Sequence, residues 1–181
     1  MSAPRIGDRP GRIIGLRFAA TRDAVRGALI AVDRALDAAG FGRELRDRTQ
    51  IALAEACNNI VEHAYGAADD GAGNGAGNGR GGTAADAVIT LDVAADRGGL
   101  QVTLRDRGGA MPGGRVPVPD LPAVDPGDPL GLPEGGFGWP LLRGMARALS
   151  LSRQNGQNTL RFRLPMSETG ADKGSGGRNA M

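Results

Sequence analysis

The chain has 181 residues, a formal net charge of +2 and a single lysine, Lys173. This length suits one domain with a substantial core, and the near-neutral charge argues against direct nucleic-acid binding. The lack of any other lysine excludes a P-loop and a protein-kinase fold, because both place a lysine on the nucleotide phosphates. With one cysteine, Cys57, and one histidine, His63, the sequence offers no disulfide framework and no multi-histidine metal site.

The two ends of the chain are polar and rich in small residues. Residues 1–12 contain Pro, Gly and Arg and are unlike a signal peptide, so we expect a disordered N-terminus and a cytoplasmic protein. No apolar run is long enough to span a membrane, and we expect no membrane partner. Residues 166–181 are rich in Gly and Ser and are expected to form a disordered tail.

The first half of the chain predicts one strand followed by two helices. Residues 13–20 alternate enough for a short edge strand. Thr21 is a suitable N-cap for the helix that follows, and Gly40 is a suitable stop for it. A second helix is expected over about residues 43–65.

Two Gly-rich segments separate the later elements. Residues 66–83 are expected to form a flexible insert, because Gly, Ala, Asn and Asp dominate them. Residues 87–94 and 100–105 then predict a hairpin of two strands. Residues 109–136 are rich in Pro and Gly, and a loop of this length is typical of a functional lid or a disordered segment.

The last elements complete the predicted fold. A third helix is expected over about residues 139–149, followed by strands at 149–154 and 159–164 on either side of the hairpin signal Asn155-Gly156. The order of elements predicts an α/β two-layer sandwich, with a mixed, mainly antiparallel sheet and helices on one face.

The second helix carries the most informative polar pattern. Glu55 and Asn59 are one turn apart and share a face, and Glu62 lies one turn further along. Carboxylate and carboxamide oxygens suit Mg²⁺, and the carboxylate is a candidate general base beside it. The alternative interpretation is a solvated polar face. The opposite face is apolar and is expected to pack on a sheet through Ile51, Ala54, Cys57, Ile60, Val61 and Ala64.

Three short motifs follow one another along the chain. They are Glu55-x-x-x-Asn59 on a helix, Asp106-Arg107-Gly108-Gly109 after a strand, and Gly135-Gly136-Phe137-Gly138 before a helix. Together with the ending Asn158 to Pro165, they resemble the N, G1 and G2 boxes of the GHKL ATPases, over about residues 13–165. The His63-Ala64-Tyr65 sequence is most similar to the anti-sigma-factor serine/threonine kinases within that superfamily.

The resemblance implies that the site binds ATP. Asp106 resembles the aspartate that accepts a hydrogen bond from the adenine amino group, which would select A over G. Gly108 and its neighbour Gly109 resemble the glycines of the G1 box, and the lack of a side chain at Gly108 lets the backbone approach the base. The alternative interpretation of Asp106-x-Gly108 is an ordinary turn.

The resemblance also implies a Mg²⁺-assisted phosphate site. Gly136 and Gly138 precede a helix whose backbone N–H groups would cradle phosphates. Asn59 resembles the Mg²⁺ ligand, and Glu55 resembles the base that orients or deprotonates the attacking hydroxyl group. Arg143 would either reach a phosphate or form a surface ion pair.

Some features depart from the family pattern or have a structural interpretation. Trp139-Pro140 replaces the residues that the family usually has after the G2 box, and we expect the tryptophan to pack beneath the lid. Proline is tolerated in a first helical turn, so the helix should survive. For His63 and Tyr65 we expect packing roles.

The family resemblance implies an ATP-dependent kinase that phosphorylates a STAS-type anti-anti-sigma protein and sequesters a sigma factor when unopposed. A possible homodimer is implied by family analogy alone. The alternative is a nucleotide-dependent partner-switching module with little or no kinase activity. Glu55 favours the enzyme, because a pure binding module needs no base. A histidine-kinase catalytic domain ranks last, because no phospho-acceptor helix pair is seen upstream.

Overall fold

The computed structural model describes residues 9–65, 87–111, 116 and 138–166. The expected insert at 66–83, Gly136, most of the expected lid and nearly all of the C-terminal tail lie outside the described residues. The described residues form one sheet and the helices that cover it.

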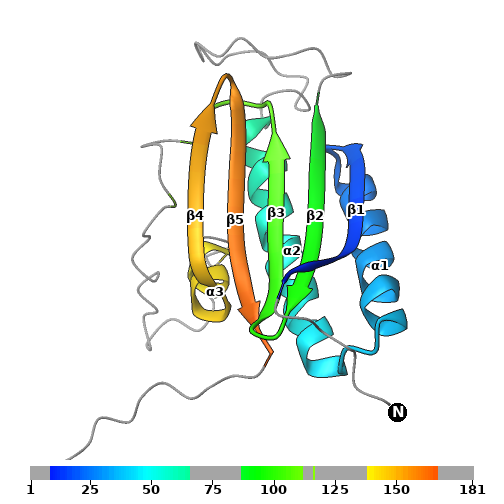
Figure 1. Ribbon diagram of the computed structural model, residues 1–181. Coiled ribbons are helices and arrows are strands. Elements are labelled where there is room, and N and C mark those ends of the chain that lie inside the picture. The colour runs from blue at the N-terminus through cyan, green and yellow to red at the C-terminus, as the bar shows by residue number, and fades with distance from the viewer. Residues whose placement is uncertain (1–8, 66–86, 112–115, 117–137, 167–181) are drawn as a thin grey trace, which may run out of the picture.

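A five-stranded sheet forms one layer of the molecule (Figure 1). Its strands are β1 Gly11–Ala19, β2 Val88–Asp96, β3 Gly99–Asp106, β4 Arg147–Gln154 and β5 Gln157–Pro165. They lie in the order β1-β2-β3-β5-β4, and all four pairings are antiparallel. The predicted edge position of the first strand is therefore confirmed.

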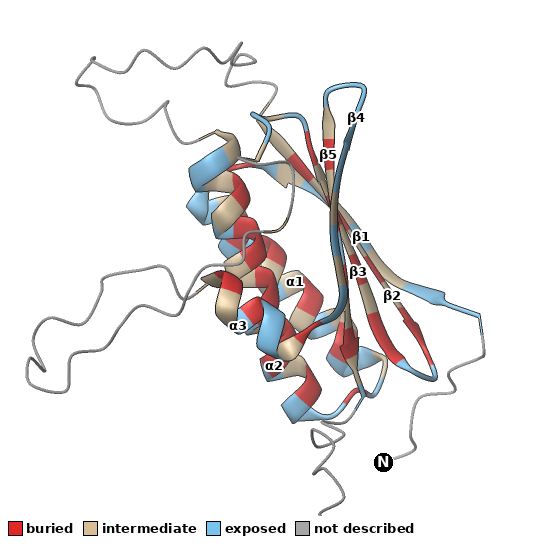
Figure 2. Cartoon of the chain, turned by 90° about the vertical axis from the view of Figure 1, so that its left-hand side faces the viewer, coloured by how far each residue is buried: buried red, intermediate tan, exposed pale blue. Residues whose placement is uncertain are grey.

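The helices form the second layer and cover one face of the sheet (Figure 2). They are α1 Arg22–Ala38, α2 Arg43–Asn59 with a π-helical turn η1 Ile60–Ala64 at its end, and α3 Gly138–Met145. The two-layer α/β fold predicted from the sequence is confirmed. Within the described residues, no helix combines the length and the apolar character needed to cross a membrane.

The element boundaries follow from local chemistry. The Thr21 side chain accepts a hydrogen bond from the backbone N–H of Ala24 at 3.3 Å, as expected of an N-cap. Gly40 adopts a positive φ of 82°, and Phe41 N–H donates to Leu36 C=O at 3.0 Å, which closes a Schellman motif. The Asn155-Gly156 turn connects β4 to β5 with positive φ at both residues, as a type I′ hairpin requires.

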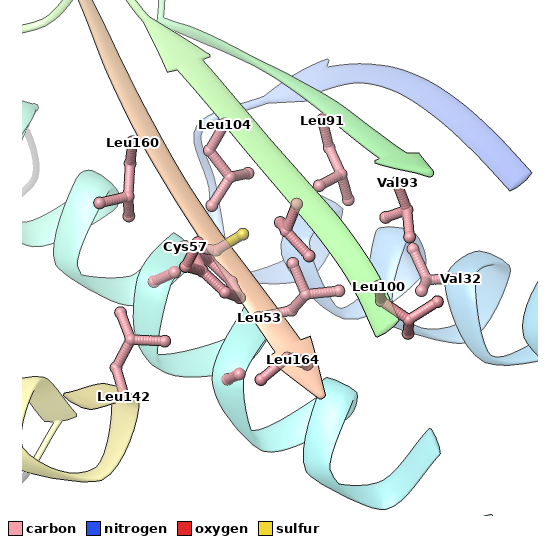
Figure 3. Close-up of a cluster of buried hydrophobic side chains, with 14 of the residues drawn as sticks. Val32, Leu53, Cys57, Leu91, Val93, Leu100, Leu104, Leu142, Leu160 and Leu164 are labelled. Carbon is pink, nitrogen blue, oxygen red and sulfur yellow. The ribbon is translucent and has the colours of Figure 1, made fainter. Parts of the chain in front are cut away.

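The core lies between the helices and the sheet (Figure 3). Apolar side chains from α1, α2, α3 and the central strands converge there, including Val32, Leu53, Leu91, Leu104, Leu142 and Leu160. Cys57 is buried among them, and burial raises the pKa of its thiol to about 12. Its predicted role as a core residue is confirmed.

The structure corrects three sequence predictions about the helices. The second helix is not α-helical to residue 65, because its last turn, Ile60–Ala64, is a π-turn. Ile51 does not pack on the sheet, since it lies on the outer face of α2 and is 46% exposed. The third helix ends at Met145 rather than residue 149, because the chain from Arg147 onward pairs with β5.

Trp139 lies in the first turn of α3. It is buried and belongs to the hydrophobic core, so packing between the layers fixes the start of this helix. Pro140 follows it inside the same first turn, where the missing N–H costs no helical hydrogen bond.

Candidate functional site

Asp106 is the last residue of the central strand β3 and is buried. Its Oδ1 atom accepts two hydrogen bonds, one from the backbone N–H of Gly108 at 2.9 Å and one from Asn158 Nδ2 at 2.8 Å. The bond to Gly108 makes the segment a tight turn of the Asx type. Within the described part of the chain, no donor reaches Oδ2, which leaves that oxygen able to accept a hydrogen bond from a ligand.

Two opposing effects act on the charge of Asp106. Burial raises the pKa of Asp106 above its ordinary value, because desolvation disfavours the carboxylate. The hydrogen bonds from Asn158 and Gly108 and the positive charge of Arg153 act in the opposite direction. These partners help to keep the buried group ionised, and only the ionised group accepts hydrogen bonds at both oxygens.

The turn after Asp106 packs against the end of the π-turn. A Cβ atom at Gly108 would lie 2.5 Å from the backbone oxygen of Ala64, so only glycine fits there without a shift. The N–H of Gly109 donates to the same Ala64 oxygen at 2.8 Å. Close packing between the turn and the helix end therefore explains the glycine at position 108.

Tyr65 follows the π-turn and also holds this segment. It packs against the core, and its hydroxyl oxygen accepts a hydrogen bond from the backbone N–H of Arg107 at 3.1 Å. Burial raises the pKa of Tyr65, which keeps the hydroxyl protonated. The packing expected of Tyr65 is therefore found, whereas His63 is exposed and does not pack.

The β4–β5 hairpin contributes two residues to which sequence reasoning gave no role. Asn158 donates through Nδ2 to Asp106 and also to the Gly109 carbonyl oxygen, at 2.9 Å. Arg153 donates through Nη1 to Asn158 Oδ1 at 2.6 Å and to the Gly108 carbonyl oxygen at 2.9 Å. Asn158 was noted only as part of the chain's ending, because its contact with Asp106 depends on the strand register.

A second group of residues meets where α2 faces the start of α3. A Cβ atom built on Gly138 would lie 2.4 Å from Glu55 Oε2 and 3.6 Å from Asn59 Nδ2. The structure thus brings together three of the residues singled out in the sequence, Glu55, Asn59 and Gly138. The absence of a side chain at Gly138 leaves room for the carboxylate and the carboxamide beside the helix start.

The donor set of this second group suits a Mg²⁺–phosphate ligand. Asn59 Nδ2 is buried without a hydrogen-bond partner in the described structure, so its amide has bonding capacity to spare. Rotating the Asn59 amide by half a turn would put its oxygen in the position of Nδ2. One amide oxygen and the nearby Glu55 carboxylate fit a cation that takes most of its ligands from phosphates and water. Among the described residues there is no cluster of three acidic, His or Cys side chains that would form a metal site alone.

The remaining residues singled out in the sequence are not placed in either group by the contacts described above. Arg143, on α3, donates to the backbone oxygen of Val116 at 3.2 Å, so it contacts the segment expected to be the lid. Gly136 lies outside the described residues. Glu62 is exposed and lies 4.0 Å from Arg22, so it belongs to the surface and not to the site.

Comparison with known proteins identifies the family. The histidine kinase-like ATPase domain matches residues 18–164, which include both groups of site residues. A search of curated proteins gives no match to this chain. The match supports ATP binding and covers most of the sequence. The chain belongs to the histidine kinase-like ATPase domain family.

Proposed function

We propose that this protein is an ATP-dependent serine/threonine kinase of the anti-sigma type. It would phosphorylate a STAS-type anti-anti-sigma protein and hold a sigma factor when that partner is absent or phosphorylated. The observation that carries the enzymatic part of the proposal is the meeting of Glu55, Asn59 and Gly138 at the start of α3. A carboxylate in that position is suited to accept the proton of an attacking hydroxyl group.

The residues of the two groups have separate roles in this proposal. Asp106 Oδ2 accepts a hydrogen bond from the adenine amino group, and the Gly108-Gly109 turn lets the base approach the backbone. Glu55 takes the proton from the serine or threonine hydroxyl group. The oxygen of that hydroxyl group attacks the terminal phosphorus of ATP, and ADP leaves. Asn59, with Glu55 nearby, would hold Mg²⁺, which neutralises phosphate charge when it is bound.

The first prediction tests nucleotide recognition by calorimetry. ATP and ADP should bind in the presence of Mg²⁺, and GTP should bind much more weakly, because a carboxylate accepts from an amino group but is repelled by a keto oxygen. Asp106→Asn should weaken ATP binding by about 1–3 kcal/mol, the cost of spoiling a buried charged hydrogen bond. Since burial raises the pKa of Asp106, ATP affinity should also fall as the pH drops through that raised pKa. Equal affinities for ATP and GTP would overturn the proposed base site.

A second prediction concerns the start of α3. Gly138→Ala should displace the Glu55 carboxylate and lower phosphoryl transfer by about 10-fold to 10²-fold, because small misplacements of a reacting group are costly. Nucleotide affinity should change little. Gly144→Ala is the matched control, since a Cβ atom there meets nothing within 4 Å and should slightly stabilise the same helix. Equal transfer rates in the two variants would show that the Gly138 contact has no catalytic consequence.

The kinase proposal itself is tested by radiolabel transfer. The full chain is incubated with labelled ATP and a candidate STAS-type partner, and label on a partner serine or threonine supports the proposal. If ATP binds but no captured partner is labelled, the protein is a nucleotide-dependent binding module instead.

A further inference from the structure

Three polar residues form one row across the ends of neighbouring strands, next to the expected base site. In the strand register, Asp106 on β3 is opposite Asn158 on β5, and Asn158 is opposite Arg153 on β4. Figure 1 shows the β4–β5 turn beside the C-terminal end of β3, where this row lies. The row therefore links an exposed arginine to a buried carboxylate through a buried amide.

The arginine fixes which way the amide faces. A guanidinium group can only donate hydrogen bonds, so the Asn158 atom that contacts Arg153 at 2.6 Å must be the carbonyl oxygen. The Asn158 nitrogen then faces the opposite way, toward Asp106 Oδ1 and the Gly109 carbonyl oxygen. Both N–H groups of the amide therefore donate. If the amide were turned over, its oxygen would face these two acceptors.

The same arginine holds the glycine turn. Its Nη1 atom also donates to the Gly108 carbonyl oxygen at 2.9 Å, while the N–H of Gly108 donates to Asp106 Oδ1 at 2.9 Å. Both donors to Asp106 thus reach a single oxygen, Oδ1. Rotation of the carboxylate would break both bonds, so the position of Oδ2 is set by the row.

We propose that Arg153 is a positioning and specificity-determining residue, which acts through Asn158 to present one oxygen of Asp106 to the amino group of the nucleobase. This inference rests on the proposed ATP site. Without Arg153, the Asn158 amide oxygen and the Gly108 carbonyl oxygen both lose their donor, so the amide and the glycine turn are held less tightly and the Asp106 acceptor is no longer fixed. The consequence is a loss of discrimination between bases that differ only at the position of the amino group.

The test compares ATP with inosine triphosphate, in which a keto oxygen replaces the adenine amino group. Calorimetry on the full chain gives the ratio of ATP affinity to inosine triphosphate affinity. It is measured for the parent, Arg153→Met and Arg153→Lys. The ratio should fall about 10-fold in Arg153→Met, the effect of losing one well-placed hydrogen bond. Arg153→Lys keeps a cationic donor and should recover part of the ratio. Arg161→Met is the control, because Arg161 is an exposed arginine of β5 outside the row.

The pH profile of ATP binding separates positioning from general damage. Among the described residues, the charged and polar groups that face Asp106 are Arg153 on β4, Asn158 on β5, the backbone N–H of Gly108, and Tyr65 after the π-turn. Removing the positive charge of Arg153 should make ATP affinity begin to fall at a higher pH than in the parent. Arg161→Met should keep the parent profile.

The possible outcomes are distinct. A lowered ratio together with a shifted pH profile supports the proposal. The role of Arg153 is overturned, while the ATP site stands, by either of two results in a parent that binds ATP. In the first, Arg153→Met keeps the parent's ratio of affinities and its pH profile. In the second, Arg153→Met binds ATP and inosine triphosphate more weakly by the same factor. If the parent binds no ATP, the proposed function and this inference both fail.

Discussion

Replacing Glu55 with glutamine is expected to leave ATP binding in place and to lower phosphoryl transfer by about 10²-fold or more. Glutamine keeps the size of the side chain and most of its hydrogen bonding, but it cannot accept the hydroxyl proton. The measurement is radiolabel transfer to a captured partner, alongside calorimetric ATP affinity. Nucleotide-dependent capture of the partner should also survive, since the change leaves Asp106 and the glycine turn untouched.

Two variants serve as references for this result. Glu62→Gln removes a carboxylate from the same helical region, but Glu62 is exposed and lies beside Arg22 on the surface, so transfer should be unchanged. Asn59→Ala should instead weaken Mg²⁺-dependent ATP binding and transfer together, because Asn59 would hold the ion that neutralises phosphate charge. Transfer by Glu55→Gln at the parent rate would mean that the proposed base is wrong.

Gly108→Ala is expected to have the largest effect on folding and binding together. The added methyl group would lie 2.5 Å from the Ala64 backbone oxygen and 2.6 Å from its Cβ atom, and backbone cannot move aside as a flexible side chain can. Overpacking of this kind costs about 1–3 kcal/mol of unfolding free energy. Since the turn also positions Asp106, ATP affinity should fall as well.

The neighbouring glycine provides a matched control for this change. A Cβ atom at Gly109 would meet the Ala64 oxygen at 3.6 Å and the His63 oxygen at 3.9 Å, which are ordinary contacts. Gly109→Ala should therefore stay close to the parent in a denaturant melt and in calorimetry. If both variants melt and bind like the parent, the close packing of Gly108 on the π-turn has no energetic importance.

Local sequence signals predicted the fold well, because they act through a few neighbouring residues. The Thr21 cap, the Gly40 stop and the Asn155-Gly156 turn each depend on the conformational preference of one or two side chains. Alternation in β2 and β3 likewise gives one buried and one polar face. The end of α3 was missed because pairing of Arg147 with β5 overrides local helix preference.

The site was predicted only in part, for a different physical reason. Glu55 and Asn59 are related by helical spacing, so their common face is visible in the sequence. The contact of Arg153 and Asn158 with Asp106 depends on how β3, β5 and β4 are aligned, which no local pattern specifies. The exposure of Ile51 was also missed, because the orientation of α2 on the sheet is set by the whole core.

The π-turn at the end of α2 has a consequence for the number of residues between the two halves of the site. One π-turn accommodates an additional residue within a helix, and each residue of an α-helix turns the chain by about 100°. If all five residues of Ile60–Ala64 were wound as an α-helix, Tyr65 and the Ala64 carbonyl group would be rotated away from the Asp106 turn. The π-turn therefore sets the angle at which the helix end meets the base site, and an α-helical turn would need one residue fewer to connect the phosphate site to the base site in the same way.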